Sequence, residues 1–98
     1  MANHLIWNER AANEYDRLFV YLLDEWGENT ALRVIFEIDQ KIKNIREQPE
    51  LFPVFIKKKK IRRCVASPQT SVYFKLIHQN IEIIAVIDNR QNPKKRKL

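Results

Sequence analysis

The sequence predicts a small α+β domain in which a helical hairpin packs on a mainly antiparallel sheet, with the element order β-α-α-β-β-β. Two stretches whose apolar residues recur every three or four positions follow one another in the first half, separated by Gly27. Pro49 ends this periodicity, and runs of β-branched residues follow it. With 98 residues and 45% apolar content, the chain suits one modest core. We therefore expect a single domain over residues 1–93.

The first strand and the first helix are predicted from the residues before Gly27. Leu5 to Trp7 is a brief apolar segment before Asn8. From Glu9 onward, apolar residues at helical spacing form one face: Ala12, Tyr15, Phe19, Leu22 and Trp26. Gly27, the one glycine of the chain, stands where a left-handed C-cap is expected. The first helix should therefore end near Trp26.

A second helix is predicted between Gly27 and Pro49. Its apolar residues lie at spacings of four, three, four and three: Ala31, Ile35, Ile38, Ile42 and Ile45. Asn29 or Thr30 is expected to cap its start, and Pro49 to stop it. The short connection makes the two helices an antiparallel hairpin whose apolar stripes need a partner surface.

The second half is predicted to supply that surface as strands. Val54 to Ile56 and Ile61 to Ala66 are rich in β-branched residues, but nearby prolines make them short or edge-like. Ser71 to Ile77 and Ile81 to Ile87 are the clearest strands, joined by a tight turn over residues 78–80. Because nearly every position of the last strand is apolar, we expect it to be central and covered on both faces.

Charge is distributed very unevenly along the chain. Residues 1–50 hold ten acids and six bases, whereas residues 51–98 hold two acids and twelve bases, which gives the halves −4 and +10. Eleven of those bases fall in two stretches, over residues 57–63 and 90–97. A field of this kind indicates an anionic partner. The tail over residues 94–98 is expected to be disordered.

Several classes of protein are disfavoured by composition. No segment approaches the ~20 apolar residues that span a bilayer, and the start lacks the pattern of a secretory signal, so we expect a cytoplasmic protein. The single cysteine, Cys64, is interpreted as a small buried strand residue. His4 and His78 lie far apart in sequence and give no zinc-ligand spacing, so neither a metal nor a cofactor is expected.

Together these features resemble the RelE/ParE superfamily of bacterial toxins. The resemblance rests on the element order, the helix from Ala11 to Gly27, the Pro49 stop, the strand entry at Ile61 and the ending over residues 88–93, Asp-Asn-Arg-Gln-Asn-Pro. It implies the toxin of a type II toxin-antitoxin module, with growth inhibition, plasmid stabilisation and a cognate antitoxin in a hetero-oligomer. One branch of the superfamily cleaves mRNA on the ribosome, and another poisons DNA gyrase.

RNA cleavage through the 2′-hydroxyl needs a proton acceptor, a proton donor and cations that hold the charge on phosphorus. Lys58, Lys60 and Arg62 alternate, so in an extended strand they would share one face, which resembles the basic strand of the nuclease branch. Arg90 is similar to a second phosphate-holding arginine of that branch. Ser71, however, stands where the nucleases have an arginine, and no tyrosine or histidine follows Arg90.

The candidate catalytic residues are therefore Lys58, Lys60, Arg62 and Arg90, with no visible acid or base. The candidate residues for binding a target or nucleic acid are the same four together with Arg63 and Tyr73. Simpler interpretations stand beside these. A lysine run is often a solvated edge, and Tyr73 and Trp26 are expected to pack in or near the core.

Three functions remain open at this point. The first is a toxin that binds gyrase, which the missing acid and base favour. The second is a ribosome-dependent mRNA endonuclease, and the third is an inactive basic binding module. All three predict an acidic partner, and an antitoxin rich in acids and apolar residues would suit both the basic segment and the helical hairpin.

Overall fold

The computed structural model describes residues 4–89 and residue 98, and it confirms the predicted order of elements. The single 3-10 turn of this part of the chain, η1, lies between the helices and the last four strands. The elements are β1 (His4–Trp7), α1 (Glu9–Trp26), α2 (Glu28–Glu47), η1 (Pro49–Leu51), β2 (Val54–Ile56), β3 (Ile61–Ser67), β4 (Thr70–Ile77) and β5 (Asn80–Asp88).

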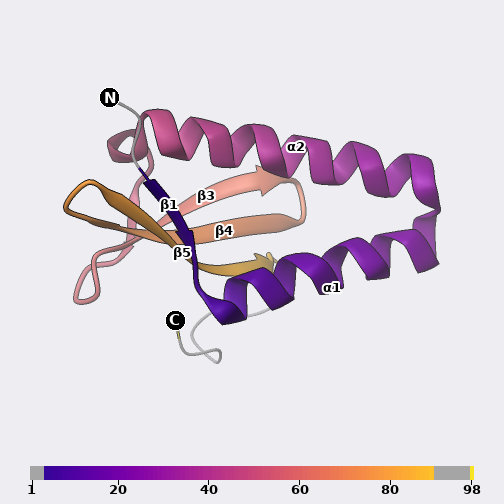
Figure 1. Cartoon of the computed structure of the whole chain (residues 1–98), viewed down its shortest axis with the longest axis horizontal. Helices are drawn as coiled ribbons and strands as arrows, with labels where there is room; N and C mark the ends of the chain where they lie inside the picture. The colour runs from indigo at the N-terminus through magenta and orange to yellow at the C-terminus, as the bar shows by residue number, and fades with distance from the viewer. Residues whose placement is uncertain (1–3, 90–97) are drawn as a thin grey trace.

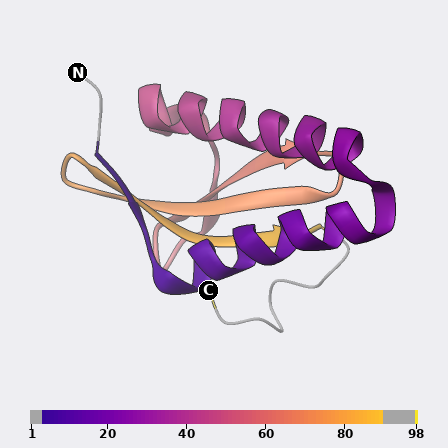
Figure 2. The same cartoon turned by 45° about the vertical axis from the view of Figure 1, so that its right-hand side comes forward.

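The strands form one five-stranded sheet in the order β1-β5-β4-β3-β2. β1 runs parallel to β5, and the other neighbours are antiparallel. Both helices lie on the same face of this sheet, where α1 packs on β5 and α2 on β3 (Figures 1 and 2). β5 lies between β1 and β4, which confirms the prediction that the most apolar strand is an interior one.

Burial divides the core between the two faces of the sheet. The larger cluster lies under the helices and joins α2 to the sheet through residues such as Ile38, Ile45 and Phe74. The smaller cluster lies on the other face and contains Ile61, Tyr73, Ile84, Ala85 and Ile87, with Ile56 and Leu98 packed against it. Because residues of β5 belong to the clusters on both faces of the sheet, almost every position of this strand is apolar.

Local hydrogen bonds explain where the helices begin and end. The side chain of Asn8 accepts a hydrogen bond from the Ala11 amide at 2.8 Å and so caps α1. Gly27 has a φ of 87° and lies between the two helices as their entire connection. The prediction that Asn29 or Thr30 caps α2 is wrong, since α2 begins at Glu28 and its cap position is Gly27.

The expected boundary between domain and tail, at residues 93 and 94, lies outside the described residues. Of the predicted tail, the structure describes Leu98 alone, whose backbone oxygen accepts a hydrogen bond from Lys59 Nζ at 2.6 Å. Among the described residues, no helix is long and apolar enough to cross a membrane.

Candidate functional site

The predicted alternation of Lys58, Lys60 and Arg62 along one strand face is wrong. Lys57 to Lys60 form the turn between β2 and β3, and strand β3 begins only at Ile61. Lys60 has a φ of 54°, which is turn geometry, and all four lysines are exposed. A turn forms here because β2 pairs with β3 in an antiparallel hairpin, and the four residues between them must reverse the chain. These lysines therefore form a projecting cationic tip, which we call the lysine turn.

Arg62 and Arg63 point to opposite faces of the sheet. Arg62 pairs with Phe74 on the helix side, and its guanidinium donates to the backbone oxygens of Phe52, at 2.6 Å, and Glu50, at 3.4 Å. Arg63 pairs with Tyr73 on the other side. The half-buried Arg62 thus fastens the segment before β2, and Arg63 is the arginine that shares a face with Tyr73.

The aromatic side chains near Arg63 are already packed. Tyr73 is 2% exposed, so the prediction that it binds a target or stacks on a base is wrong and its packing role is confirmed. Its ring centroid lies 5.3 Å from that of Phe55, and the Arg63 guanidinium lies 4.9 Å from the Phe55 centroid. Burial prevails because Tyr73 occupies the middle of β4, where the smaller cluster needs a large ring.

Arg90 lies outside the described residues, whereas Asn89, the residue before it, is described. The Asn89 amide donates to the Gln69 oxygen at 2.7 Å, and Ser71 Oγ donates to Asn89 Oδ1. Both bonds hold Asn89 at the end of the sheet where β3 turns into β4. The lysine turn lies at the opposite end, about 26 Å away along the nine residues of β5. Ser71 is buried here, and its hydrogen bond to Asn89 gives it a structural role.

Both histidines lie at the lysine-turn end of the sheet. His78 is in the β4–β5 turn, with a φ of 55°, and the His4 amide donates to the Gln79 oxygen at 3.2 Å. The two turns are separated by about two strand spacings, or about 10 Å. Among the described residues, the exposed His78 side chain makes no hydrogen bond to a lysine of the lysine turn.

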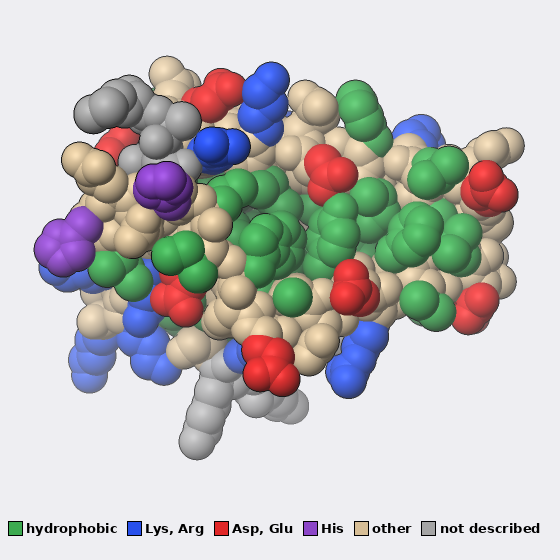
Figure 3. All heavy atoms as spheres, in the orientation of Figure 1, with side chains coloured by type: hydrophobic (Ala, Val, Ile, Leu, Met, Phe, Trp, Pro, Cys, Tyr) green, Lys and Arg blue, Asp and Glu red, His purple; other side chains and the backbone are tan. Residues whose placement is uncertain are grey.

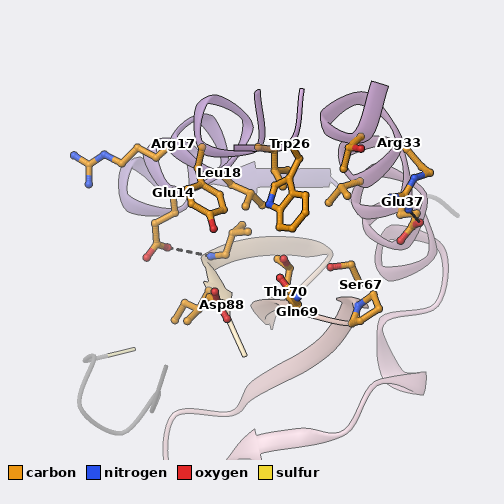
Figure 4. A pocket seen from close by; sticks show the side chains of 17 residues that line it. Glu14, Arg17, Leu18, Trp26, Arg33, Glu37, Ser67, Gln69, Thr70 and Asp88 are labelled. Carbon is orange, nitrogen blue, oxygen red and sulfur yellow. Dashed lines mark hydrogen bonds and ion pairs between the residues drawn. The ribbon is translucent and has the colours of Figure 1, made fainter. Parts of the chain in front are cut away.

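A second candidate site is a groove of about 710 Å³ beneath the far end of the helical hairpin. The undersides of α1 and α2 form its roof, and the β3–β4 turn and the end of β5 form its floor (Figure 4). Glu14, Leu18 and Trp26 come from α1, and Ser67 and Thr70 come from the floor. This site, which we call the hairpin groove, lies at the opposite end of the sheet from the lysine turn.

Trp26 is the residue of this groove that the sequence interpretation missed. Its ring points into the space between the helices and the floor, yet 64% of the residue is exposed (Figure 4). The expectation of a core or core-edge position is wrong because α1 extends past the end of the sheet. An available signal was the position of Trp26 at the last turn of the helix, beside Gly27.

The polar groups of the hairpin groove are arranged by the helices. Glu14 Oε1 accepts a hydrogen bond from the Val86 amide at 3.0 Å, which ties α1 to β5. Arg33 and Glu37 form an ion pair at 3.3 Å on α2. The groove therefore combines an apolar roof with charges of both signs at its rim, as in a typical protein-binding pocket.

The pKa values of two side chains, Tyr15 and Cys64, are shifted, and neither residue belongs to the lysine turn or lines the hairpin groove. Burial raises the pKa of Tyr15 above its ordinary value, and a 2.6 Å hydrogen bond from its hydroxyl to Asp39 adds to the shift. Burial also raises the pKa of Cys64, with Lys41 acting weakly in the other direction. A Cys64 thiol that is 2% exposed and kept protonated is a packing residue, as predicted.

The family is decided by comparison with known proteins. Residues 5–93 match the family described as the ParE toxin of the type II toxin-antitoxin system, parDE. The chain belongs to the ParE toxin family. This result confirms the predicted RelE/ParE superfamily.

Solved structures similar to this ParE family member agree on the fold. A chain from the chromosomal ParDE toxin-antitoxin system of P. aeruginosa is 18% identical, with a TM-score of 0.74 over 89% of this chain and 96% of that one. A copper-bound mutant toxin from Helicobacter pylori is 14% identical, with a TM-score of 0.55 over 89% of this chain and 94% of that one. No curated protein sequence matches this chain.

Metal-ligating clusters are lacking in the part of the ParE-family chain that the structure describes. Within residues 4–89 and 98, no group of three or more His, Cys, Asp or Glu side chains could hold a metal ion. The copper bound by the Helicobacter pylori mutant toxin is a property of that protein.

Proposed function

We propose that this chain inhibits growth by binding DNA gyrase in the cytoplasm and that a cognate antitoxin neutralises it. Membership in the ParE toxin family supports the toxin role. The mechanism is supported by one observation above all: within the described residues, no Asp, Glu, His or Tyr side chain makes a hydrogen bond or ion pair with a lysine of the lysine turn. A toxin without such groups acts by binding rather than by cleaving RNA.

The hairpin groove is the surface that best suits the antitoxin. Its roof exposes large apolar side chains, of which Trp26 is 64% and Tyr21 48% exposed. An apolar face of this kind in a protein without its partner indicates a protein-binding site. An antitoxin segment with an amphipathic helix would place its apolar side chains beneath α1 and α2 and its charges at the Arg33 and Glu37 rim.

The experiment is to induce the chain in cells with and without its antitoxin and to follow growth, mRNA 5′ ends and DNA breaks together. The proposal predicts growth arrest with accumulating DNA breaks and intact mRNA, and recovery when the antitoxin is co-induced. Soluble protein that leaves growth unchanged would contradict the toxin role.

Ribosome-dependent RNA cleavage is a second candidate, and one observation favours it. The lysine turn and both histidines lie at the same end of the sheet, so a long RNA could contact all of them. In the induction experiment, this mechanism would produce new mRNA 5′ ends at codon-phased positions and no DNA breaks.

A further inference from the structure

The lysine turn presents cationic side chains that the rest of the described chain does not use. Lys59 donates to Leu98, but within residues 4–89 and 98 the ammonium groups of Lys57, Lys58 and Lys60 make no hydrogen bond or ion pair. In Figure 3, Lys and Arg side chains gather at the lower left, where Figure 1 shows the β2–β3 turn projecting from the sheet. These groups are available to an external anion.

Two further cations extend this surface along the face of the sheet that the helices leave uncovered. Lys75 is the cross-strand partner of Ile61, and Arg63 is the partner of Tyr73, so both lie on the side of the smaller core cluster. Glu82, the partner of Lys75 on β5, offsets part of this charge. The positive field is therefore strongest from the lysine turn to Arg63 and weaker beyond Lys75.

The packing of the aromatic side chains beside Arg63 bears on whether this surface suits single-stranded or double-stranded nucleic acid. Single strands are held by exposed rings on which bases stack. Here the Phe55 ring is covered on one side by Arg63 and packs against Tyr73, and Tyr73 itself is buried. A surface with free cations, whose partly exposed ring is already covered on one side by Arg63, suits a regular phosphate backbone better than unstacked bases.

The shape of the lysine turn agrees with a duplex as the ligand. It is the tip of a two-stranded ribbon, β2 and β3, at the outer edge of the sheet. The major groove of B-DNA admits a two-stranded ribbon, and the phosphates of both strands line its edges. Lys57, Lys58 and Lys60 at the tip can therefore reach phosphates without any base-specific contact.

From these observations we propose that the lysine turn and Arg63 bind the phosphate backbone of double-stranded DNA directly. The inference deepens the proposed function, on which its biological meaning rests: a gyrase-directed toxin with this surface would also contact the DNA that gyrase holds. The binding itself is a property of the toxin alone and can be measured without gyrase.

The test measures fluorescence anisotropy of a labelled duplex of about 20 base pairs with the purified chain, over a range of salt concentrations. We compare Lys57→Gln/Lys58→Gln with Lys41→Gln/Lys43→Gln, which removes the same charge from exposed positions on α2. The first variant should bind about tenfold or more weakly at low salt, and the slope of log affinity against log salt should fall by about 2. The second should bind like the unchanged chain.

Thermal melting of both variants shows whether they are folded, which is expected because all four lysines are exposed. The inference is overturned if the unchanged chain does not bind the duplex at low salt, or if the two variants weaken binding equally. It is also overturned if single-stranded RNA of the same length binds as tightly as the duplex. If the unchanged chain binds the duplex but does not inhibit gyrase, the proposed function is contradicted and the DNA-binding inference stands.

Discussion

Arg62 shows how one residue can be recognised in the sequence and still be assigned the wrong task. Its place in a Lys-x-Lys-x-Arg pattern suggested an exposed phosphate ligand, but its guanidinium is used to bind two backbone oxygens of the segment before β2. We therefore expect the removal of Arg62 to carry a structural cost. A sequence pattern gives the charge of a side chain but not the acceptor that folding brings to it.

Replacing Arg62 tests this structural role. Arg62→Ala should lower the free energy of unfolding by about 1–2 kcal/mol, because both carbonyl oxygens lose a charged donor. Lys58→Ala is the matched control and should change it by less than about 0.5 kcal/mol, since Lys58 is exposed in the lysine turn. Denaturant titration measures both values. Equal stability of the two variants would contradict the anchoring role.

Tyr15 gives a prediction of pH dependence. The folded protein holds the pKa of Tyr15 above its ordinary value, whereas an unfolded tyrosine ionises near pH 10. Above about pH 10 the unfolded chain therefore releases a proton that the folded chain keeps, and stability falls as the pH rises. The contribution is fully present below that pH.

Tyr15→Phe isolates this contribution. The loss of stability between about pH 8 and about pH 10.5 should be smaller in Tyr15→Phe than in the unchanged chain, because the titrating hydroxyl is gone. Denaturant midpoints at the two pH values measure the difference. An identical pH dependence in both proteins would show that Tyr15 titrates normally.

At the scale of the element, the connection between the helices is a single residue, Gly27. Its φ of 87° and ψ of 173° lie in a region that is essentially restricted to glycine. A Cβ at this position would have no heavy atom within 4 Å, so any cost of a side chain comes from the backbone and not from a clash. The tight hairpin therefore depends on this glycine.

Gly27→Ala should lower the free energy of unfolding by about 1–3 kcal/mol through backbone strain alone. Asn29→Ala is the control: Asn29 is exposed and makes no capping hydrogen bond, so the change should be less than about 0.5 kcal/mol. Thermal and denaturant unfolding measure both. A larger loss for Asn29→Ala than for Gly27→Ala would restore Asn29 as the helix cap.

Helices and strands were predictable because each has a short-range signal. The three-and-four spacing gave α1 and α2 within a residue or two, and Pro49 marked the end of α2. The paired apolar runs gave β4 and β5. The lysine turn was not predictable from alternation, because the hairpin pairing of β2 with β3 decides its conformation.

At the scale of the whole molecule, two surfaces lie at opposite ends of the sheet. The lysine turn is cationic and projects from one end, and the hairpin groove, which both apolar and polar side chains line, opens at the other. The charge asymmetry of the sequence predicted the first surface. The second could not be predicted, because it depends on how far the helices extend beyond a sheet whose size is set by long-range pairing.

The groove makes a prediction about antitoxin binding. Trp26→Ala should weaken antitoxin affinity by about 30-fold or more, as expected for a large aromatic side chain at the centre of an interface. Phe36→Ala is the matched control, because Phe36 is 62% exposed on α2 but does not line the groove. Calorimetric titration of each variant with the antitoxin measures the difference. Equal losses in the two variants would place the interface elsewhere.

The most direct test of the proposed mechanism is a gyrase cleavage assay with the purified chain, supercoiled plasmid and ATP. A gyrase-directed mechanism predicts that the toxin traps gyrase in its cleaved state, so that linear plasmid appears after denaturation of the enzyme, and that added antitoxin prevents it. Folded toxin that arrests growth in cells but produces no trapped cleavage would contradict the gyrase-directed mechanism.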